Sequence, residues 1–262
     1  MQIAADSVTV AYRRGKPVLA GVSLAVESGE SVALIGPSGA GKTTILRLLA
    51  RTIVPDAGRV LIDGCDLARL AGRGLRTVRA SIGVIHQRGD LIPTMSALSN
   101  VAVATQAALG ARAALRLAVR GPDRRTERAC MAALDRLEIG HLADTRIDEM
   151  SGGQRQRVAV ARLVLQAPRV ILADEPTASV DDRTTDVVSA VLRDLVASGA
   201  AMVLATHDLN LARSSDRIAA VSAGEIVYDG GASGLDPDLV SGVYAAHPDE
   251  RQAACWVRPA CP

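Results

Sequence analysis

A short glycine-rich segment of the sequence could hold phosphate groups. Its residues are Gly-Pro-Ser-Gly-Ala-Gly-Lys-Thr, which fit the pattern G-x-x-x-x-G-K-[ST]. In this pattern the glycines let successive backbone N–H groups turn inward around phosphates, while the lysine serves an outer phosphate and the hydroxyl serves Mg²⁺. The candidate nucleotide-binding residues are Gly36, Pro37, Ser38, Gly39, Ala40, Gly41, Lys42, Thr43 and Thr44, and Thr43 is also a candidate Mg²⁺ ligand.

A glycine-rich structural turn is the alternative explanation for this segment. Its flanks argue against that alternative, because an apolar run at Ser31–Ile35 precedes the glycines and a helical pattern over Lys42–Arg51 follows them. A phosphate-binding loop requires this order of strand, loop and helix N-terminus. We therefore expect the segment to bind the phosphates of a nucleotide.

Two adjacent acids, Asp174 and Glu175, follow another apolar run at Val170–Ala173. Ligands bind at the carboxyl ends of buried parallel strands in open α/β sheets. We expect Asp174 to hold Mg²⁺, directly or through water, and Glu175 to polarise an attacking water as a general base. The alternative is that the two acids simply lie at a solvated strand end. The presence of a phosphate-loop lysine, Lys42, in the same chain argues against that alternative.

The elements that would position these residues are short apolar strands that alternate with helices. Further strand candidates lie at 8–11, 18–26, 58–62, 82–85, 201–205 and 218–221. Strands that are apolar along their whole length indicate a mostly parallel sheet covered on both faces. The prediction is an α/β fold of the P-loop NTPase type, RecA-like, with an antiparallel β element and an inserted α-helical subdomain.

The insertion is visible as a change of pattern between about Asp90 and Glu149. Segments 97–106, 111–119 and 126–137 have helical periodicity, and no strand pattern separates them. After Gly230 the pattern weakens, so we expect a poorly ordered tail at the end of the chain.

The segment Met150–Arg157 narrows the class of nucleotide-binding protein. Its sequence, MSGGQRQR, resembles the LSGGQ signature of ABC transporter ATPases, with Met150 in the place of the usual leucine. A helix capped by Ser151 explains the same residues, and the family uses that geometry. The resemblance implies that a γ-phosphate of ATP held by another subunit is contacted by Ser151, Gly152, Gly153 and Gln154. It also implies an ABC ATPase domain over 1–243, a helical signature subdomain at 90–152 within it, and a tail at 244–262.

Four further positions match the family in order and spacing. Tyr12 matches the aromatic residue that stacks on adenine, and Gln87 matches the glutamine that senses Mg²⁺ and links to the membrane partner. Asp181, at the end of segment 178–181, matches the loop that crosses the dimer interface, and His207 matches the histidine that hydrogen-bonds the γ-phosphate. An edge-strand tyrosine and an ordinary polar residue are the alternatives for Tyr12 and His207. The resemblance implies catalytic roles for Glu175, His207 and Gln87, and Mg²⁺ ligation by Thr43, Gln87 and Asp174.

One phosphate loop and one signature occur in the chain. In the family each ATP lies between the loop of one subunit and the signature of another, so the resemblance implies a dimer that holds two ATP. A homodimer and a paralogous pair both fit. Closure and opening of the dimer would drive permease subunits in the membrane, and through them act on a solute-binding protein.

Within the family the chain is most similar to the ATPase subunits of phosphonate importers. The similarity lies in 109–120, 140–162 and 235–244. Arg88-Gly89-Asp90 departs from the aromatic or Asn-containing segment that usually follows the glutamine, which leaves the permease and the cargo open. Phosphate-like anions, amino acids and lipoproteins are the alternative cargoes.

Composition and charge place limits on the partners. The net charge of +2 and the near absence of aromatic residues give no sign of nucleic-acid binding, so we expect no nucleic acid as a partner. Neither a signal peptide nor an apolar run long enough to span a membrane is expected, which predicts a peripheral subunit on the cytoplasmic face of the cell membrane. The four cysteines, Cys65, Cys130, Cys255 and Cys261, have no metal-binding spacing and are expected to be reduced.

Other roles remain open from the sequence alone. An ABC ATPase acting on nucleic acid would usually carry two cassettes, long coiled coils or zinc-binding cysteines, and none of these patterns occurs here. A non-transport ABC subunit of a phosphonate-degrading complex would have nearly the same motifs. A regulator without turnover is disfavoured by Glu175 and His207 together. The arginines at four-residue spacing, 112, 116, 120, 124 and 128, form either a basic stripe or a solvated helix face that Pro122 interrupts.

Overall fold

A computed structural model of the chain describes residues 1–12, 17–86, 90–104, 121–178 and 180–245. The chain divides into two compact units. The first unit contains Met1–Leu70, Leu172–Asp174 and Ala201–Pro262, and the second contains Ala71–Ile171 and Glu175–Ala200. Among the helices of the described residues, none has both the length and the hydropathy that crossing a bilayer requires.

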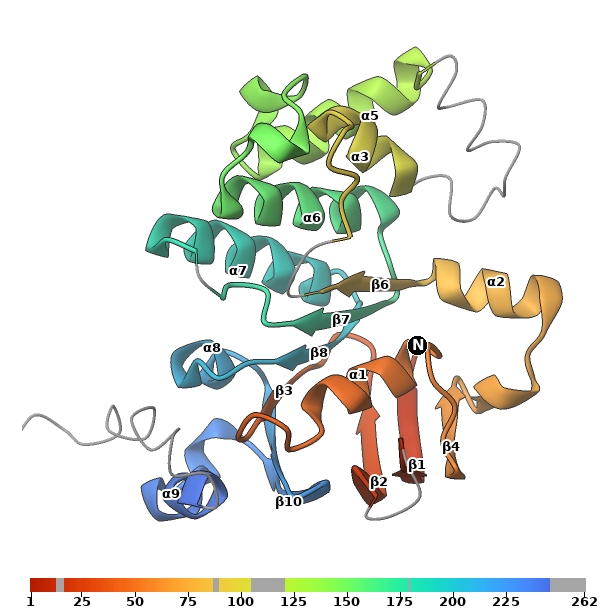
Figure 1. Cartoon of the computed structure of the whole chain (residues 1–262), viewed down its shortest axis with the longest axis vertical. Helices are drawn as coiled ribbons and strands as arrows, with labels where there is room; N and C mark the ends of the chain where they lie inside the picture. Colours follow the sequence, from red (N-terminus) through yellow and green to blue (C-terminus); the bar gives the residue numbers. More distant parts are fainter. Residues whose placement is uncertain (13–16, 87–89, 105–120, 179, 246–262) are drawn as a thin grey trace, which may run out of the picture. The chain divides into compact units, whose positions relative to one another are not determined.

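An antiparallel sheet forms one part of the first unit (Figure 1). Its strands, in the spatial order β2-β1-β4-β5, are β1 (Ile3–Val10), β2 (Leu19–Val26), β4 (Ala57–Ile62) and β5 (Cys65–Asp66). In β2, every second residue from Val22 to Val26 is buried and the residues between them are exposed. This alternation is typical of a sheet with one face on the core and one in water.

A parallel set of strands forms the other part of the first unit. Strand β3 (Ser31–Ile35) lies between β8 (Ala201–Ala205) and β9 (Arg217–Ser222), and it runs parallel to both. Every residue of β3 and β8 is buried, as expected for strands covered on both faces. Strand β10 (Glu225–Gly230) pairs antiparallel with β9 at the edge.

The described residues of this unit contain three α-helices: α1 (Lys42–Leu49), α8 (Leu209–Arg213) and α9 (Pro237–Ala245). A core cluster joins α8 and α9 to the parallel strands through buried side chains of Ile35, Ala212, Ile218, Val240 and Tyr244. The expected boundary between domain and tail, at residues 243 and 244, therefore falls inside α9, with Tyr244 buried.

The second unit is mainly helical. The α-helices in the part of this unit that the structure describes are α2 (Gly72–Ala80), α3 (Ala97–Ala104), α5 (Arg124–Arg136), α6 (Gly152–Gln166) and α7 (Asp182–Ala197). Helices α3, α5 and α6 pack against one another, and α7 packs against α6 (Figure 1). Strand β6 (Ile82–Ile85) is held to α6 by the Gln166 side chain, whose Nε2 donates to the carbonyls of Ala80 and Ile82 at 3.0 Å each.

Strand β7 (Val170–Asp174) begins in the second unit and ends in the first. Its first four residues are buried and Asp174, the last, is partly exposed. The buried apolar strand thus ends in the Asp174 carboxylate.

The predicted α/β architecture, with an antiparallel element and inserted helices, is confirmed. Expected helices at 97–106 and 126–137 correspond to α3 and α5, whereas 111–119 lies outside the described residues. Helix α5 begins after Pro122, because Asp123 caps it by accepting a hydrogen bond from the Thr126 backbone N–H at 2.8 Å. Cys65 and Cys130 are unpaired thiols, and Cys255 and Cys261 lie outside the described residues.

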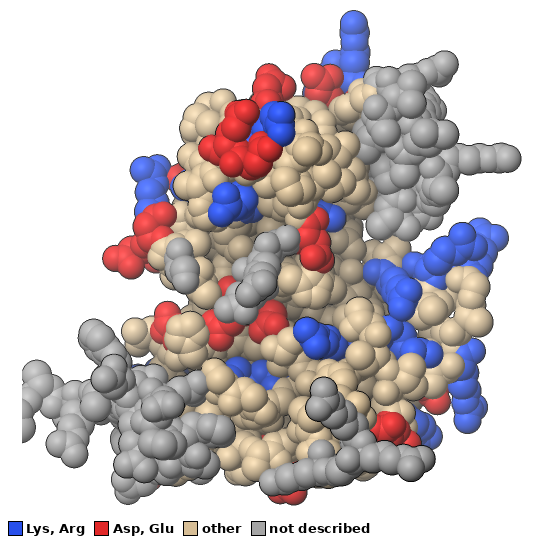
Figure 2. Space-filling view, in the orientation of Figure 1, with Lys and Arg blue, Asp and Glu red and all other residues tan. Residues whose placement is uncertain are grey.

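Basic side chains gather over helix α2 (Figure 2). The helix carries Arg73, Arg76 and Arg79, contains no acidic residue and has no buried residue among its nine. It is therefore a solvated helix whose formation depends little on an apolar face.

Candidate functional site

The predicted phosphate loop joins the end of β3 to the N-terminus of α1. Gly36, Gly39 and Gly41 have φ angles of 142°, 78° and 114°, which residues with a side chain rarely adopt. Space excludes a side chain as well, because a Cβ on Gly36 would lie 2.1 Å from the Val221 carbonyl oxygen. Glycine is thus required at this position by both backbone conformation and close approach.

Both ends of the loop are held by the C-terminal part of the first unit. The Gly224 N–H, in the turn between β9 and β10, donates to the Ala40 carbonyl at 3.1 Å. The Gly36 N–H donates to the Tyr244 hydroxyl oxygen on α9 at 3.2 Å. These contacts come from residues about 180 to 210 positions away in the sequence, which motif analysis does not reveal.

Lys42 and the N-terminus of α1 create a positive environment inside the loop. Nζ of Lys42 donates to the carbonyl oxygens of Gly36 at 2.6 Å and Pro37 at 3.1 Å. The helix has no acidic residue in its first turn, and its N-cap residue, Gly41, has no side chain that could accept a hydrogen bond from the first N–H groups. The first N–H groups of the helix therefore face the loop with a favourable partial charge for an anion.

The two predicted Mg²⁺ ligands with described positions lie side by side. The Thr43 hydroxyl donates to the Asp174 carboxylate at 3.0 Å, although 131 residues separate them. Hydroxyl and carboxylate oxygens are the hard donors that Mg²⁺ prefers, so this pair fits the ion. The described residues contain no group of three or more His, Cys, Asp or Glu side chains that could hold a metal by themselves. A cation at this pair would depend on phosphate oxygens for further ligands.

Tyr12 lies just beyond β1 with its side chain largely exposed. Its hydroxyl is 3.4 Å from the Thr44 hydroxyl, in the first turn of α1. This contact places an exposed aromatic ring, 53% accessible, beside the helix that ends the phosphate loop. A ring in that position could stack on a nucleotide base.

His207 and the phosphate loop lie at the same end of the parallel strands. Leu34 of β3 pairs with Ala205 of β8. Gly36 lies two residues after Leu34, and His207 lies two residues after Ala205. The Thr206 N–H donates to the Leu34 carbonyl at 3.1 Å, which extends the pairing to the residue before His207. The His207 side chain is exposed at this end of the sheet.

Glu175 has an unusual backbone conformation. Its φ is 52°, in the left-handed region, directly after the last residue of β7. Non-glycine residues with such angles are uncommon and often belong to functional sites, where the surrounding structure imposes the conformation. In the second unit, Gln156 contributes to this by donating from Nε2 to the Pro176 carbonyl at 2.6 Å.

Ser151 caps the N-terminus of α6 in a reciprocal arrangement. Its hydroxyl accepts from the Gln154 N–H at 3.2 Å, and the Gln154 side chain accepts from the Ser151 N–H at 2.9 Å. This capping box orders the helix tip and leaves the hydroxyl proton of Ser151 as a donor. The sequence MSGGQ thus forms a helix N-terminus with two glycines, Gly152 and Gly153, in its first turn.

Gly153 brings the tip of α6 close to the N-terminus of α7. Asp181 caps α7 by accepting from the Thr184 N–H at 2.8 Å and from the Thr184 hydroxyl at 2.9 Å. These hydrogen bonds, that of the backbone N–H first, lower the pKa of the Asp181 carboxyl below its ordinary value. A Cβ on Gly153 would lie 3.0 Å from the Thr184 hydroxyl and 3.2 Å from the Asp181 carboxylate, so these two predicted motif residues are neighbours within the second unit.

The candidate site residues fall into two groups. The first unit contains the phosphate loop, Tyr12, Asp174 and His207, and the second contains Glu175, Ser151 to Gln154 and Asp181. Gln87, the third predicted Mg²⁺ ligand, and Ser179 lie outside the described residues.

Contacts that no short motif reveals also support these groups. Tyr244 and Gly224 hold the phosphate loop, as described above. In the second unit the buried Asn100 side chain accepts from the Ile92 N–H at 2.7 Å and donates to the carbonyls of Ile92 and Ser96. The only sequence signal for Asn100 is a polar residue among apolar ones in the pattern of α3.

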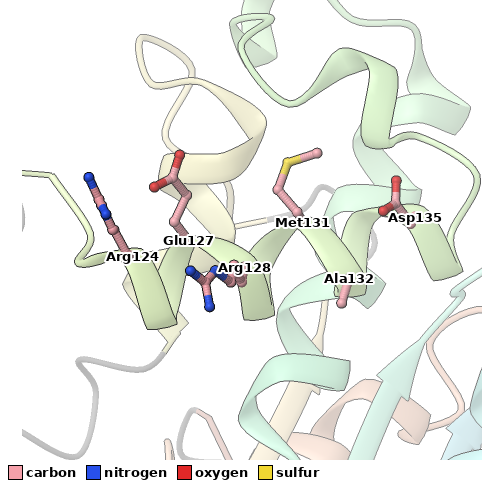
Figure 3. A pocket seen from close by; sticks show the side chains of 6 residues that line it. All are labelled: Arg124, Glu127, Arg128, Met131, Ala132 and Asp135. Carbon is pink, nitrogen blue, oxygen red and sulfur yellow. The ribbon is translucent and has the colours of Figure 1, made fainter.

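An open hollow of about 530 Å³ lies on helix α5 (Figure 3). Its lining contains Arg124 and Arg128 together with Glu127 and Asp135, so charges of both signs are mixed. Figure 3 shows the side chains of Arg124 and Arg128 pointing in different directions. The two described arginines of the four-residue series thus lie on a surface of mixed charge, and the other three lie outside the described residues.

Comparisons with known proteins point in one direction. Residues 19–178 match the family described as ABC transporter. The Phosphonates import ATP-binding protein PhnC of Bordetella parapertussis is 37% identical, over 89% of this chain and 92% of its own length. The Phosphonates import ATP-binding protein PhnC 1 of Rhodopseudomonas palustris is 40% identical, over 89% of this chain and 83% of its own length.

Solved structures with the same fold include two of the cassette MJ0796. One is a dimeric structure of this bacterial ABC transporter cassette, with a TM-score of 0.79 and 31% identity over 89% of this chain and 100% of that chain. The other is a dimer in a post-hydrolysis state bound to ADP and Pi, with a TM-score of 0.77 and 32% identity over the same shares.

The contact at Gly153 predicts different effects for alanine at the two glycines of α6. Gly152→Ala places a methyl group in open space, whereas Gly153→Ala forces the Thr184 and Asp181 side chains to move. Alanine favours a helix over glycine by about 1 kcal/mol at either position, and the crowding at Gly153 opposes that gain by about 1–3 kcal/mol. In urea unfolding we expect Gly153→Ala to be less stable than Gly152→Ala by at least about 1 kcal/mol. Equal stabilities would show that α7 does not constrain Gly153.

Proposed function

This chain belongs to the ABC transporter family, and we propose that it binds and hydrolyses ATP to power a phosphonate importer whose membrane-spanning subunits are separate proteins. The observation that carries the proposal is the contact between the Thr43 hydroxyl and the Asp174 carboxylate, beside the glycine-rich loop whose carbonyls hold Lys42. This arrangement provides the two requirements of phosphoryl transfer from a nucleotide, namely a cradle for the phosphates and oxygen ligands for Mg²⁺.

ATP binding would use residues of the first unit. The exposed ring of Tyr12 stacks on adenine, and the backbone N–H groups of Gly39 and of Gly41 to Thr44 surround the phosphates. Lys42 exchanges its hydrogen bonds with two loop carbonyls for hydrogen bonds with phosphate oxygens. Its ammonium group then neutralises charge on the substrate. Thr43 and Asp174 hold Mg²⁺, which neutralises charge on the phosphates; Gln87 is proposed as a further ligand.

Hydrolysis would use two residues that follow the ends of strands, Glu175 directly after β7 and His207 two residues after β8. Glu175 accepts a proton from the attacking water, and it directly follows the last residue of β7. His207, at the matching end of β8, donates a hydrogen bond to the γ-phosphate oxygens. The two residues thus act on the water and on the phosphate, respectively.

The second half of each ATP site would come from another copy of the chain. The capped tip of α6 offers the Ser151 hydroxyl, the N–H groups of Gly152 and Gly153, and the Gln154 side chain to a γ-phosphate. Asp181, next to Gly153, accompanies this tip to the dimer interface. The dimeric structures of MJ0796 support an assembly of two cassettes. We propose a homodimer with two ATP at its interface.

The importer proposal defines the other partners and the location. The similar PhnC proteins are named as ATP-binding proteins of phosphonate import, which supports a permease as the direct partner and a solute-binding protein as an indirect one. The subunit would then act on the cytoplasmic face of the membrane. We propose that segment 88–90 contacts the permease and helps to determine which permease the subunit binds.

Glu175→Gln tests the assignment of the general base. The amide cannot accept the proton, so we expect ATP turnover to fall by about 10²-fold or more while ATP binding persists. ATP-loaded Glu175→Gln should elute as a dimer in size-exclusion chromatography. Glu225→Gln, which changes an exposed carboxylate on β10, is the control and should hydrolyse ATP like the wild type. Wild-type turnover in Glu175→Gln would reject Glu175 as the base.

A mixture of two inactive variants tests the shared site. Lys42→Ala removes the phosphate contact of the loop, and Ser151→Arg blocks the signature, so each homodimer should have almost no ATPase activity. A mixed dimer contains one site with the intact loop of the Ser151→Arg subunit and the intact signature of the Lys42→Ala subunit. We expect mixing to restore activity at up to one site per mixed dimer. A mixture as inactive as its components would contradict a site shared between copies.

The proposed cargo is tested with the complete transporter. The chain is co-purified with its permease, placed in liposomes with the solute-binding protein, and its ATPase rate is measured with phosphonates, phosphate or amino acids. We expect phosphonates to give the largest stimulation of the ATPase rate. Stimulation by amino acids alone would assign the subunit to a different importer.

A further inference from the structure

Tyr244 connects the last described helix to the first glycine of the phosphate loop. Its side chain is 3% accessible and packs in the core cluster with Ile35, the residue before Gly36. Within this cluster its hydroxyl oxygen accepts the Gly36 N–H at 3.2 Å. A polar group at the end of a buried aromatic ring therefore contacts the backbone of the loop directly.

The backbone of Gly36, with the peptide groups on both sides of its α-carbon, is held from three sides. Its N–H donates to Tyr244, its carbonyl accepts from Lys42 at 2.6 Å, and its α-carbon lies against the Val221 carbonyl. At φ 142° the residue sets the direction in which the chain leaves β3 for the loop. A small rotation of the backbone at Gly36 would move both the loop entrance and the Gly36 carbonyl that orients Lys42.

We propose that Tyr244 is a positioning residue for ATP binding, whose hydroxyl fixes the Gly36 peptide and thereby keeps the phosphate loop open before the nucleotide arrives. This inference rests on the proposed function, because it concerns the same loop. It assigns to α9 a role in nucleotide affinity in addition to its place in the core. Tyr244 touches neither ATP nor the water, and it acts through Gly36.

The hydroxyl group, rather than the ring, carries the effect. Phenylalanine at 244 would fill the same space in the cluster but leave the buried Gly36 N–H without this acceptor. An unsatisfied buried donor is unfavourable, so the peptide would rotate towards another acceptor and the loop would lose its fixed starting point. The cost appears in ATP binding because phosphate binding requires the N–H groups of the loop to point inward.

Tyr228 provides a matched control in the same region. It packs against the same core cluster from β10, and its hydroxyl donates to the Gly231 carbonyl at 2.7 Å. Tyr228→Phe therefore also removes one hydroxyl and one hydrogen bond at a tyrosine next to this cluster. Its lost partner, Gly231, belongs to the turn after β10, and the phosphate loop keeps its Tyr244 contact.

The experiment compares ATP affinity and stability of the full-length wild type, Tyr244→Phe and Tyr228→Phe. Kd for ATP is measured by competition with a fluorescent ATP analogue in Mg²⁺-free buffer, which prevents hydrolysis, and unfolding is measured in urea. Hydrogen–deuterium exchange is followed in peptides covering Ser31–Lys42. We expect Tyr244→Phe to raise Kd for ATP about three- to tenfold and to accelerate exchange in the loop peptide, with changes below about twofold for Tyr228→Phe.

Each outcome decides the proposal. A Tyr244→Phe variant that is folded under the assay conditions and binds ATP more weakly than Tyr228→Phe supports positioning by the hydroxyl. An unchanged Kd for Tyr244→Phe, or an equal loss in both variants, overturns it and leaves the proposed function intact. If Tyr244→Phe is too unstable for binding assays, exchange in the wild type decides, because a Gly36 N–H that exchanges as fast as an unprotected amide contradicts the contact. A wild type that fails to bind ATP would instead overturn the proposed function.

Discussion

The function proposed for this chain depends on keeping a short stretch of backbone in a conformation that most residues avoid. Gly36, Gly39 and Gly41 have positive φ angles, and glycines in such conformations are what allow the backbone N–H groups of a phosphate loop to turn towards an anion. The loop does not maintain this conformation by its own hydrogen bonds alone. Gly224, Tyr244 and the Val221 carbonyl constrain it from segments that come late in the sequence, so the integrity of the phosphate loop is a property of the whole first unit.

The division of the chain into two units separates the candidate groups chemically. The first unit supplies positive charge, backbone donors and the Thr43–Asp174 pair, which suit a bound triphosphate and its cation. The second supplies a helix tip whose cap is already formed by Ser151 and Gln154. Because this tip is ordered beforehand, recognition of a phosphate there requires little loss of conformational freedom. The peptide bond between Asp174 and Glu175 links the two sets covalently, because Asp174 belongs to the first unit and Glu175 to the second.

Much of the fold and of the candidate site could be predicted because the relevant signals are local. Strands β3, β8 and β9 are buried on both faces and therefore appear as uninterrupted apolar runs. Strand β10 lacked such a signal, since its residues alternate between exposed and half-buried, and α2 has no buried residue that would create an apolar stripe. Residue types, spacing and flanking patterns indicated the loop and the carboxylates, and the resemblance to the ABC signature indicated the helix tip. They could not identify Tyr244 or Asn100, because these act through contacts that depend on tertiary packing, and the φ of Glu175 is likewise imposed by its surroundings.

The hydrogen bonds of Lys42 also explain a feature of the composition. Of the thirty basic residues of the chain, only Lys16 and Lys42 are lysines. At position 42 one compact nitrogen donates to two neighbouring carbonyls, whereas a planar guanidinium distributes its donors in a wide fork. In a chain that uses arginine for nearly all of its basic residues, lysine thus stands at a position where a compact charge bonds two adjacent carbonyls of a narrow turn.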